Sequence, residues 1–409
     1  MSSVLQRQLT DALDFMPVHR QKFKRTQKLN LDILLEDYRA LQTLDAGTLD
    51  FILMGYRYTH IFQKVLAGFL SKPLSPPEIS DLLQITFAAL LTRTQVPAPV
   101  LVHEAVELAG SHFGPFTKGF TNAFFRQILR DKDQILAAID KNPTALLGDE
   151  LAQRLSKPAA QKMAQQLMAR PDSGIWAFDK NLHYDTHKID EFSDKSEPLQ
   201  AMDLGSWTFC EWATKQIVEW AAGKNSDIKA LDACAAPGGK LIALHLLLKK
   251  QGLNVHWLAT DAKQQRLDIL NHNIKRFTLQ DDCLTQLKSW GEKSGVSPQQ
   301  TKLKVDGPYD IIFADLPCTG SGTLHTRPDL LTEDFANRLV DLAPLQKAIL
   351  RDLQANLKPG GLMIVSVCSI DEQELKSISE TLGQKEPAFE SLKTLNQRSE
   401  GICGWVFVC

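Results

Sequence analysis

The chain has 409 residues, of which 44% are hydrophobic, and its formal net charge is −2 at pH 7. A single hydrophobic core rarely grows beyond a few hundred residues, so this length predicts two or three domains. The balanced charge excludes a broadly basic nucleic-acid coat, and any contact with nucleic acid must therefore come from local patches.

The N-terminal sequence MSSVLQRQLTDALDF lacks the basic and apolar regions of a secretory signal, and no stretch approaches the roughly 18 apolar residues that span a membrane. We therefore expect a cytoplasmic protein without membrane contact, and nothing in the sequence calls for an obligate protein partner. The cysteines are odd in number and form no C-x-x-C pair, so neither disulfides nor a structural metal is expected. They are Cys210, Cys234, Cys283, Cys318, Cys368, Cys403 and Cys409.

Residues 1 to about 145 are predicted to form an all-α helical bundle. Apolar residues recur three and four positions apart in LDFILMGYRYTHIFQKVLAGFL and in PEISDLLQITFAALLTRT, which is the period of an amphipathic helix. Pro97 and Pro99 separate two of these helices. From about 146 to 204 the pattern weakens, and we interpret this polar stretch as a linker or a reduced small domain.

The segment from 205 to 409 is predicted to be an α/β Rossmann-like domain. Short apolar strands alternate with helices, as in IKALDA, VHWLATD, YDIIFAD and LMIVSVC. That alternation indicates a mostly parallel sheet with helices on both faces.

A candidate cofactor site follows the first of these strands. In KALDACAAPGGKLIALHLLLKK a buried strand leads into a small-residue loop and then a helix, whose first amides lack helical partners. Gly238 and Gly239 let the backbone approach a ligand, and the next strand ends in Asp261, where an acid can accept hydrogen bonds from ribose hydroxyls. The chain has neither G-x-x-x-x-G-K-[ST] nor G-x-G-x-x-G, which favours S-adenosylmethionine over a nucleoside triphosphate or a dinucleotide.

Two cysteines are predicted to converge at one edge of the sheet. YDIIFAD runs into LPCTGSGTL, which places Asp315 and Cys318 at a strand end, and LKPGGLMIVSVCSI brings Cys368 to the end of the neighbouring strand. Carbon 5 of a pyrimidine is a poor nucleophile until a thiolate adds at carbon 6, which requires a thiol with a lowered pKa. The alternative is that both cysteines are small buried hydrophobes.

In order and spacing, ACAAPGGK, DLPCTGSG and VSVCSI resemble the Sun-type family of RNA cytosine carbon-5 methyltransferases. The stretch TRTQVPAPVLVHEAVELAGSHFGPFTKGFTNAFFRQILR resembles the NusB-like helical domain of the bacterial RsmB branch, and GICGWVFVC resembles the terminal hairpin of the catalytic domain. The resemblance implies a NusB-like RNA-binding domain followed by a methyltransferase domain, with ribosomal RNA as the partner.

The resemblance also implies roles for particular residues. Cys368 is expected to be the nucleophile and Cys318 to assist release, while Asp315 binds the cytosine and Lys240 lies near the reacting centre. A flipped-out base would enter this pocket. The residues expected to hold S-adenosylmethionine are Cys234, Ala235, Ala236, Pro237, Gly238, Gly239, Lys240, Asp261 and Asp315.

Several positions depart from the family pattern. Leu316 replaces the alanine of D-A-P-C, and Leu241 replaces a threonine after the glycine-lysine pair. The second acid expected to contact the cofactor is missing if CLTQLKSW is the third strand, because Ser289 and Trp290 take its place. A shifted strand would leave Asp281 or Asp282 as the substitute.

The parts that position RNA differ most from the family. His325 and Thr326 replace arginines before Pro328 and Asp329, the stretch Q-D-x-A-S reads CEWAT, and no R-x-N signature occurs in IWAFDKN. Basic patches at Arg20–Lys28 and at Lys118, Arg126, Arg130 and Lys132 could contact phosphates or be solvated helix faces.

The leading hypothesis is an active RNA cytosine carbon-5 methyltransferase. The alternative is a catalytically weakened RNA-binding or ribosome-assembly protein that keeps the fold. DNA cytosine methylation would require an E-N-V-type strand, and amino-group methylation of adenine would require an aromatic residue at the position of Cys318; the sequence has neither.

Overall fold

The structure is a computed structural model, and it describes the chain in stretches separated by short gaps. The described residues are 4–15, 45–70, 74, 76, 78–93, 95–169, 175–187, 198–224, 227–288, 290, 307–394 and 399–409. They form two compact units. The helical unit comprises Met1–Gln153, Ala160–Ala169 and Leu324–Glu333, and the α/β unit comprises Arg154–Ala159, Arg170–Thr323 and Asp334–Cys409.

The helical unit confirms the predicted all-α region. Residues 4–15 are helical, and the helices that follow are α3 (Ala46–Arg57), α4 (Thr59–Phe69), α5 (Ile79–Thr92), α6 (Ala98–Phe113) and α7 (Phe116–Lys141). Helix α5 is apolar on all sides, so it is buried along almost its whole length and the other helices pack around it. The ring of Phe62 contacts those of Phe87 and Phe124, with centroid distances of 5.7 and 6.3 Å. Packed aromatic side chains of this kind form the core of the unit.

The stretch 146–204 contains regular structure. It holds η1 (Pro143–Leu147), α8 (Asp149–Arg154) and α9 (Lys157–Met168), followed by β1 (Ile175–Phe178), β2 (Tyr184–His187) and β3 (Gln200–Ala201). The three strands form an antiparallel sheet in the order β2-β1-β3. Tyr184 stacks on Trp207 with a centroid distance of 4.7 Å, and Phe178 contacts the same indole. These aromatic contacts attach the small sheet to the core of the α/β unit.

The segment Leu324–Glu333 belongs to the helical unit although it follows a strand of the α/β unit in sequence. It contains η3 (Pro328–Thr332), and Leu330 and Leu331 are buried. Arg57, only 1% exposed, donates hydrogen bonds to the carbonyl oxygens of His325 at 2.9 Å and Ala169 at 3.2 Å. His325, which replaces an arginine of the family pattern, thus lies in the packed core of the helical unit.

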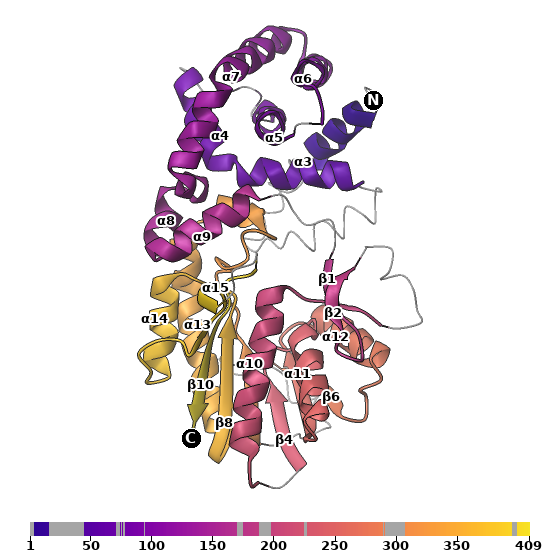
Figure 1. Cartoon of the computed structure of the whole chain (residues 1–409), viewed down its shortest axis with the longest axis vertical. Helices are drawn as coiled ribbons and strands as arrows, with labels where there is room; N and C mark the ends of the chain where they lie inside the picture. Colours follow the sequence, from indigo (N-terminus) through magenta and orange to yellow (C-terminus); the bar gives the residue numbers. More distant parts are fainter. Residues whose placement is uncertain are drawn as a thin grey trace. The chain divides into compact units, whose positions relative to one another are not determined.

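The α/β unit contains a seven-stranded sheet in the order β6-β5-β4-β7-β8-β10-β9, partly visible in Figure 1. The strands are β4 (Asp227–Asp232), β5 (Asn254–Asp261), β6 (Cys283–Leu287), β7 (Tyr309–Asp315), β8 (Leu357–Val367), β9 (Phe389–Glu390) and β10 (Cys403–Val408). Pairing is parallel from β6 to β8, whereas β10 runs antiparallel to β8 and β9. The prediction of a mostly parallel sheet is confirmed.

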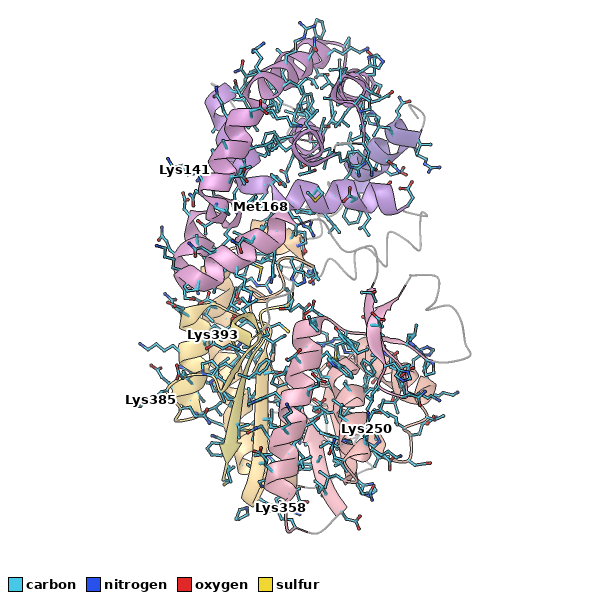
Figure 2. All side chains as sticks on the ribbon, in the orientation of Figure 1. Lys141, Met168, Lys250, Lys358, Lys385 and Lys393 are labelled. Carbon is cyan, nitrogen blue, oxygen red and sulfur yellow. The ribbon has the colours of Figure 1, made fainter. Side chains whose placement is uncertain are left out.

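Helices cover both faces of this sheet, and side chains fill the space between the layers (Figure 2). One core includes residues from α10 (Leu204–Ala221), α11 (Gly239–Lys250) and α12 (Gln264–Arg276). The opposite core includes residues from α13 (Phe335–Ala355) and α14 (Glu372–Thr381). A short helix, α15 (Ser391–Thr394), follows β9. No helix in the described part of the chain is long and apolar enough to cross a membrane.

Candidate active site

The predicted site residues lie where the central strands end. Strand β4 ends at Asp232, β5 at Asp261 and β7 at Asp315, and Cys368 directly follows β8. These strands are parallel, so their carboxyl ends share one edge of the sheet, where open α/β folds bind ligands. Lys358, labelled in Figure 2, lies near the start of β8 and therefore at the opposite edge. We call the edge at which β4, β5, β7 and β8 end the carboxyl edge.

The loop after β4 has the backbone that a cofactor cradle requires. Gly238 has φ of 105°, which L side chains rarely adopt, and an added Cβ would lie 2.6 Å from Leu270 Cδ1. Helix α11 begins at the next residue, so its first amides face the loop. Asn273 donates a hydrogen bond of 2.9 Å to the carbonyl oxygen of Pro237, which fixes the loop against α12.

Asp261 lies at the end of β5 as predicted and is 3% exposed. Its Oδ1 accepts a hydrogen bond of 3.1 Å from the backbone amide of Lys263, and its Oδ2 is 3.6 Å from Arg266 Nη1. Arg266 also donates to the carbonyl oxygen of Ala236. The guanidinium therefore joins the acid of β5 to the loop of β4, and the two predicted halves of the cofactor site lie together.

The third strand, β6, lies at CLTQL and is not shifted toward Asp281 and Asp282. Strand β6 begins at Cys283, so Asp281 and Asp282 precede it and lie at the edge opposite Asp261. The condition for either acid to replace the missing one, a shifted strand, is therefore not met. Trp290 is 5% exposed, and its Nε1 donates a 2.9 Å hydrogen bond to Thr260 Oγ1. Ser289 lies outside the described residues.

Lys240 joins two of the predicted catalytic residues. Its Nζ donates a 2.7 Å hydrogen bond to Asp315 Oδ2 and lies 3.8 Å from Cys368 Sγ. Asp315 Oδ1 accepts a further hydrogen bond of 2.6 Å from Ser366 Oγ. Burial is the largest single influence and acts to lower the pKa of Lys240, but the charge and hydrogen bond of Asp315, together with Cys368 and Glu400, raise this pKa well above its usual value. The ammonium group is therefore a fixed positive charge beside the thiol.

The Cys368 thiol is held in its neutral form in this arrangement. Burial raises its pKa well above the usual value; the Lys240 ammonium opposes this, while Asp315 and Glu400 add to it. The low thiol pKa expected from the sequence is therefore not present without substrate. If the thiol proton is removed, the Lys240 ammonium 3.8 Å away can stabilise the thiolate.

The Cys318 thiol is also held neutral. Burial raises its pKa, and the negative charges of Glu374 and Asp315 raise it further. The side-chain charges that act on Cys318 are negative, whereas the Lys240 ammonium lies 3.8 Å from Cys368 Sγ, so the two thiols differ in their charge environment. The two cysteine loops are joined directly, because the backbone amide of Gly322 donates a 3.1 Å hydrogen bond to the carbonyl oxygen of Cys368.

Sequence reasoning missed two acidic residues of the site, Asp232 and Glu400. Asp232, 1% exposed, has a pKa raised well above its usual value by burial and by Asp315, against a hydrogen bond from the Cys234 amide. Burial and the charge of Asp203 raise the pKa of Glu400 to about 8, although Lys240 opposes this. Asp232 could have been found from its place at a strand end. Glu400 stands in a loop remote in sequence and gave no such signal.

The predicted basic patches give a mixed result. Arg20–Lys28 lies outside the described residues. On α7, Lys118 forms a 2.6 Å ion pair with Glu107, and Lys132 donates a 2.6 Å hydrogen bond to the carbonyl oxygen of Leu90. Arg126 lines a groove of about 400 Å³ together with His103 and Asn122 from α6 and α7. The described residues contain no cluster of three or more His, Cys, Asp or Glu that could hold a metal ion.

Both parts of the chain are similar to known families. Residues 219–402 match the family of 16S rRNA methyltransferase RsmB/F, and residues 6–130 match the NusB family. Ribosomal RNA small subunit methyltransferase B of Pasteurella multocida is 25% identical over 85% of this chain and 81% of its own length. The probable enzyme of that name from Bacillus subtilis is 24% identical over 82% and 78%, respectively.

A solved structure supports the fold across nearly the whole chain. The crystal structure of PH0851 covers 98% of this chain and 98% of its own, with a TM-score of 0.67 and 14% sequence identity. At this identity the likeness shows the fold alone. The family matches add the chemistry: the α/β unit is an S-adenosylmethionine-dependent methyltransferase domain, preceded by a NusB-like helical domain.

Proposed function

We propose that this chain, which joins a NusB-family domain to a domain of the 16S rRNA methyltransferase RsmB/F family, methylates carbon 5 of cytosine in small-subunit ribosomal RNA with S-adenosylmethionine. The observation that carries the proposal is the position of Lys240, whose Nζ contacts both Asp315 and Cys368. A thiol, a carboxylate and a fixed cation at one strand edge are the groups that covalent activation of a pyrimidine needs.

The loop and strand ends fit S-adenosylmethionine. The backbone from Cys234 to Gly239 turns sharply at Gly238, and Asp261 offers carboxylate oxygens at the carboxyl edge, where ribose hydroxyls can donate to them. When bound, the cofactor supplies an electrophilic methyl group on a sulfonium. Lys288 and Trp290, the described residues directly after β6, are not acidic. We assign the cofactor contacts to Cys234, Ala235, Ala236, Pro237, Gly238, Gly239, Lys240, Asp261 and Asp315.

Cys368 is the proposed nucleophile. Once its thiol proton has passed to water, its sulfur adds as a thiolate to carbon 6 of the cytosine, and the π electron pair of the carbon 5–carbon 6 double bond makes carbon 5 nucleophilic. Asp315 hydrogen-bonds the polar edge of the base, which orients the ring and favours that shift of electrons. Lys240 remains charged beside both groups, so it stabilises the thiolate before attack and when it leaves again.

Cys318 is the proposed residue that assists release. After the methyl group is bonded to carbon 5, the proton on that carbon must leave so that the bond between Cys368 and carbon 6 can break. Cys318 lies on the loop bonded to that of Cys368. Once its own thiol proton has passed to water, its thiolate accepts the proton from carbon 5, the electron pair of that bond restores the carbon 5–carbon 6 double bond, and Cys368 leaves as a thiolate. The two cysteines thereby take separate steps.

The NusB-like domain, residues 1–145, is proposed to bind the RNA, with the stretch 146–204 connecting it to the catalytic residues 205–409. Arg126, exposed beside the α6/α7 groove, is the α7 cation best placed to meet a phosphate. The ribosomal RNA substrate implies that the enzyme acts in the cytoplasm. The competing reading, a weakened assembly protein, is not favoured, because the chain keeps all four proposed catalytic residues: Cys368, Cys318, Asp315 and Lys240.

Methyl transfer to RNA tests the proposal. Purified protein, labelled S-adenosylmethionine and small-subunit ribosomal RNA should yield labelled 5-methylcytosine. Bisulfite mapping of RNA from cells with and without the gene should then show one methylated cytosine that is lost with the gene. If neither assay finds 5-methylcytosine while the protein binds the RNA, the weakened assembly protein is the better account.

A further inference from the structure

Glu374 lies at the centre of a hydrogen-bond network beneath the Cys318 loop. It is fully buried, and so are Thr319, Ser321 and Ser369. Thr319 donates to Glu374 twice, from its backbone amide to Oε1 at 3.1 Å and from its hydroxyl to Oε2 at 2.6 Å. Every group that reaches this carboxylate is a donor, so a side chain that only accepts is required here.

Gln346, on α13, extends the network to the other side of the thiol. Its Nε2 donates to Glu374 Oε1 at 2.7 Å and to the carbonyl oxygen of Pro317 at 2.8 Å. Both partners are acceptors, which fixes the orientation of the amide. The backbone on each side of Cys318 is therefore held by one connected pair of side chains, Gln346 before it and Glu374 after it.

The position of Glu374 is one from which a glutamate usually caps the N-terminus of its own helix. Helix α14 has Asp371 as its N-cap, and a glutamate three residues later usually reaches back to the backbone amide of the cap. Here Ser369 Oγ accepts a 3.2 Å hydrogen bond from that amide. The carboxylate of Glu374 is thereby free to turn toward Thr319, which points to a role outside its own helix.

A chain of hydroxyls joins the two cysteine loops. Ser321 Oγ lies 2.9 Å from Ser369 Oγ, which lies 3.2 Å from Thr319 Oγ1. The Thr319 hydroxyl donates its proton to Glu374, so in its contact with Ser369 it must accept, and Ser369 donates. The Ser369 proton is then engaged with Thr319, so Ser321 must donate to Ser369. One carboxylate thus sets the direction of every hydroxyl between the residue after Cys318 and the residue after Cys368.

We propose that Glu374 and Gln346 are positioning residues for Cys318: they hold the backbone on both sides of its thiol and order the hydroxyls that join it to the Cys368 loop. The inference rests on the proposed function, in which Cys318 assists release. Neither side chain contacts the sulfur in this network: Gln346 acts through the loop, and Glu374 acts through the loop and through its charge.

The first experiment needs no RNA. Cys318 in the full-length protein is alkylated with iodoacetamide across a range of pH, and mass spectrometry compares its rate with that of exposed Cys409. The titratable groups that bear on Cys318 are Glu374 from α14, Asp315 from β7, and the thiols Cys368 and Cys403. Glu374→Gln removes one negative charge and places an amide donor against donors. Glu372→Gln makes the same change at an exposed position of the same helix.

In Glu374→Gln the alkylation profile of Cys318 should move to lower pH by about one unit, a rise of about tenfold in rate at neutral pH. The profile of Glu372→Gln should match the wild type. Matching profiles in the two variants would overturn the proposal. If Glu374→Gln does not fold, Gln346→Met carries the test: it should speed alkylation of Cys318 several-fold, and an unchanged rate would overturn the role of the pair.

The second experiment uses RNA and separates this inference from the proposed function. In Gln346→Met the covalent protein–RNA adduct should form at the wild-type rate and persist several-fold longer, because only the release step loses its positioned thiol. An adduct lifetime equal to the wild type would contradict the inference. If even the wild type forms neither adduct nor 5-methylcytosine, the proposed function fails, and the alkylation profiles still decide whether the pair positions Cys318.

Discussion

Lys240 Nζ and Asp315 Oδ2 are 2.7 Å apart, and the two side chains come from different elements, the start of α11 and the end of β7. The side chains are 15% and 28% exposed, so the pair is largely removed from water. Removing either charge should destabilise the folded protein, because a largely buried charge without a partner has a high desolvation free energy. This ion pair therefore connects the start of α11, which follows the proposed cofactor loop, to the end of β7.

Lys240→Met should destabilise the protein and abolish methyl transfer. The variant leaves Asp315 without its cation and removes the positive charge from beside Cys368. We expect a loss of about 2 to 3 kcal/mol in the free energy of unfolding, somewhat below the cost for a fully buried pair. Urea denaturation measures the loss. Lys249→Met, at an exposed position at the end of the same helix, is the control and should change neither quantity.

Cys368→Ser should abolish methyl transfer without unfolding the protein. The hydroxyl is close to the thiol in size but is a far weaker nucleophile, so carbon 6 is not attacked and carbon 5 stays unreactive. Incorporation of labelled methyl groups into RNA measures the effect. Cys283→Ser, a buried cysteine away from the site, should keep activity. An unchanged methylation rate in Cys368→Ser would remove Cys368 from the role of nucleophile.

Cys318→Ala should accumulate a covalent protein–RNA adduct. Attack and methyl transfer remain possible, but the release step lacks its thiol. A slowly migrating species on a denaturing gel, dependent on S-adenosylmethionine and absent from the double variant with Cys368→Ser, is the expected result. Turnover at the wild-type rate with no such species would mean that another group assists release.

Trp290→Phe should weaken the cofactor edge through one hydrogen bond. Trp290 Nε1 donates to Thr260 Oγ1, and Thr260 donates in turn to the carbonyl oxygen of Ala233 at 3.0 Å, at the start of the cofactor loop. Its matched control is Trp257→Phe, because Trp257 is also buried but its Nε1 has no hydrogen-bond partner among the described residues. We expect Trp290→Phe to cost about 1 kcal/mol more than Trp257→Phe in urea denaturation. Equal costs would show that the hydrogen bond contributes nothing.

Glu400→Gln should stabilise the protein increasingly as pH rises from about 4.5 toward 8. Burial and Asp203 raise the pKa of Glu400 to about 8, so the folded state binds this proton more tightly than the unfolded state does. Stability from this group is complete below the unfolded pKa of about 4.5 and is lost as pH rises toward 8. We expect no effect at pH 4 and a gain of about 1 to 3 kcal/mol at pH 8.5, with exposed Glu372→Gln as control. A gain that is the same at both pH values would exclude ionisation of Glu400 as its cause.

The sequence predicted the parts of the site that depend on strand order. Asp261, Asp315 and Cys368 each follow an apolar run, and the carboxyl ends of parallel strands meet at one edge, so pattern alone brings them together. The helical unit was equally accessible, because apolar residues recur with a strong helical period in α4 and α7.

The remaining parts depend on contacts that leave no local pattern. Glu374 stands three residues after Asp371, a spacing that describes a helix start, and only the structure shows its carboxylate turned toward Thr319. The raised pKa of Cys368 was also missed, because burial, which a motif does not report, outweighs the charge of Lys240. From the sequence, His325 was interpreted only as the replacement of an arginine that positions RNA. The structure shows that His325 is buried and that its carbonyl oxygen accepts a hydrogen bond from Arg57.

The assignment of Leu324–Glu333 to the helical unit bears on how the gene can be divided. An expression product that stops before the catalytic domain would lack Leu330 and Leu331, and the apolar surface they cover would meet water. A product containing only the catalytic domain would carry the same ten residues without the helices they pack on. The two halves of this protein are therefore better studied by point variants than by truncation.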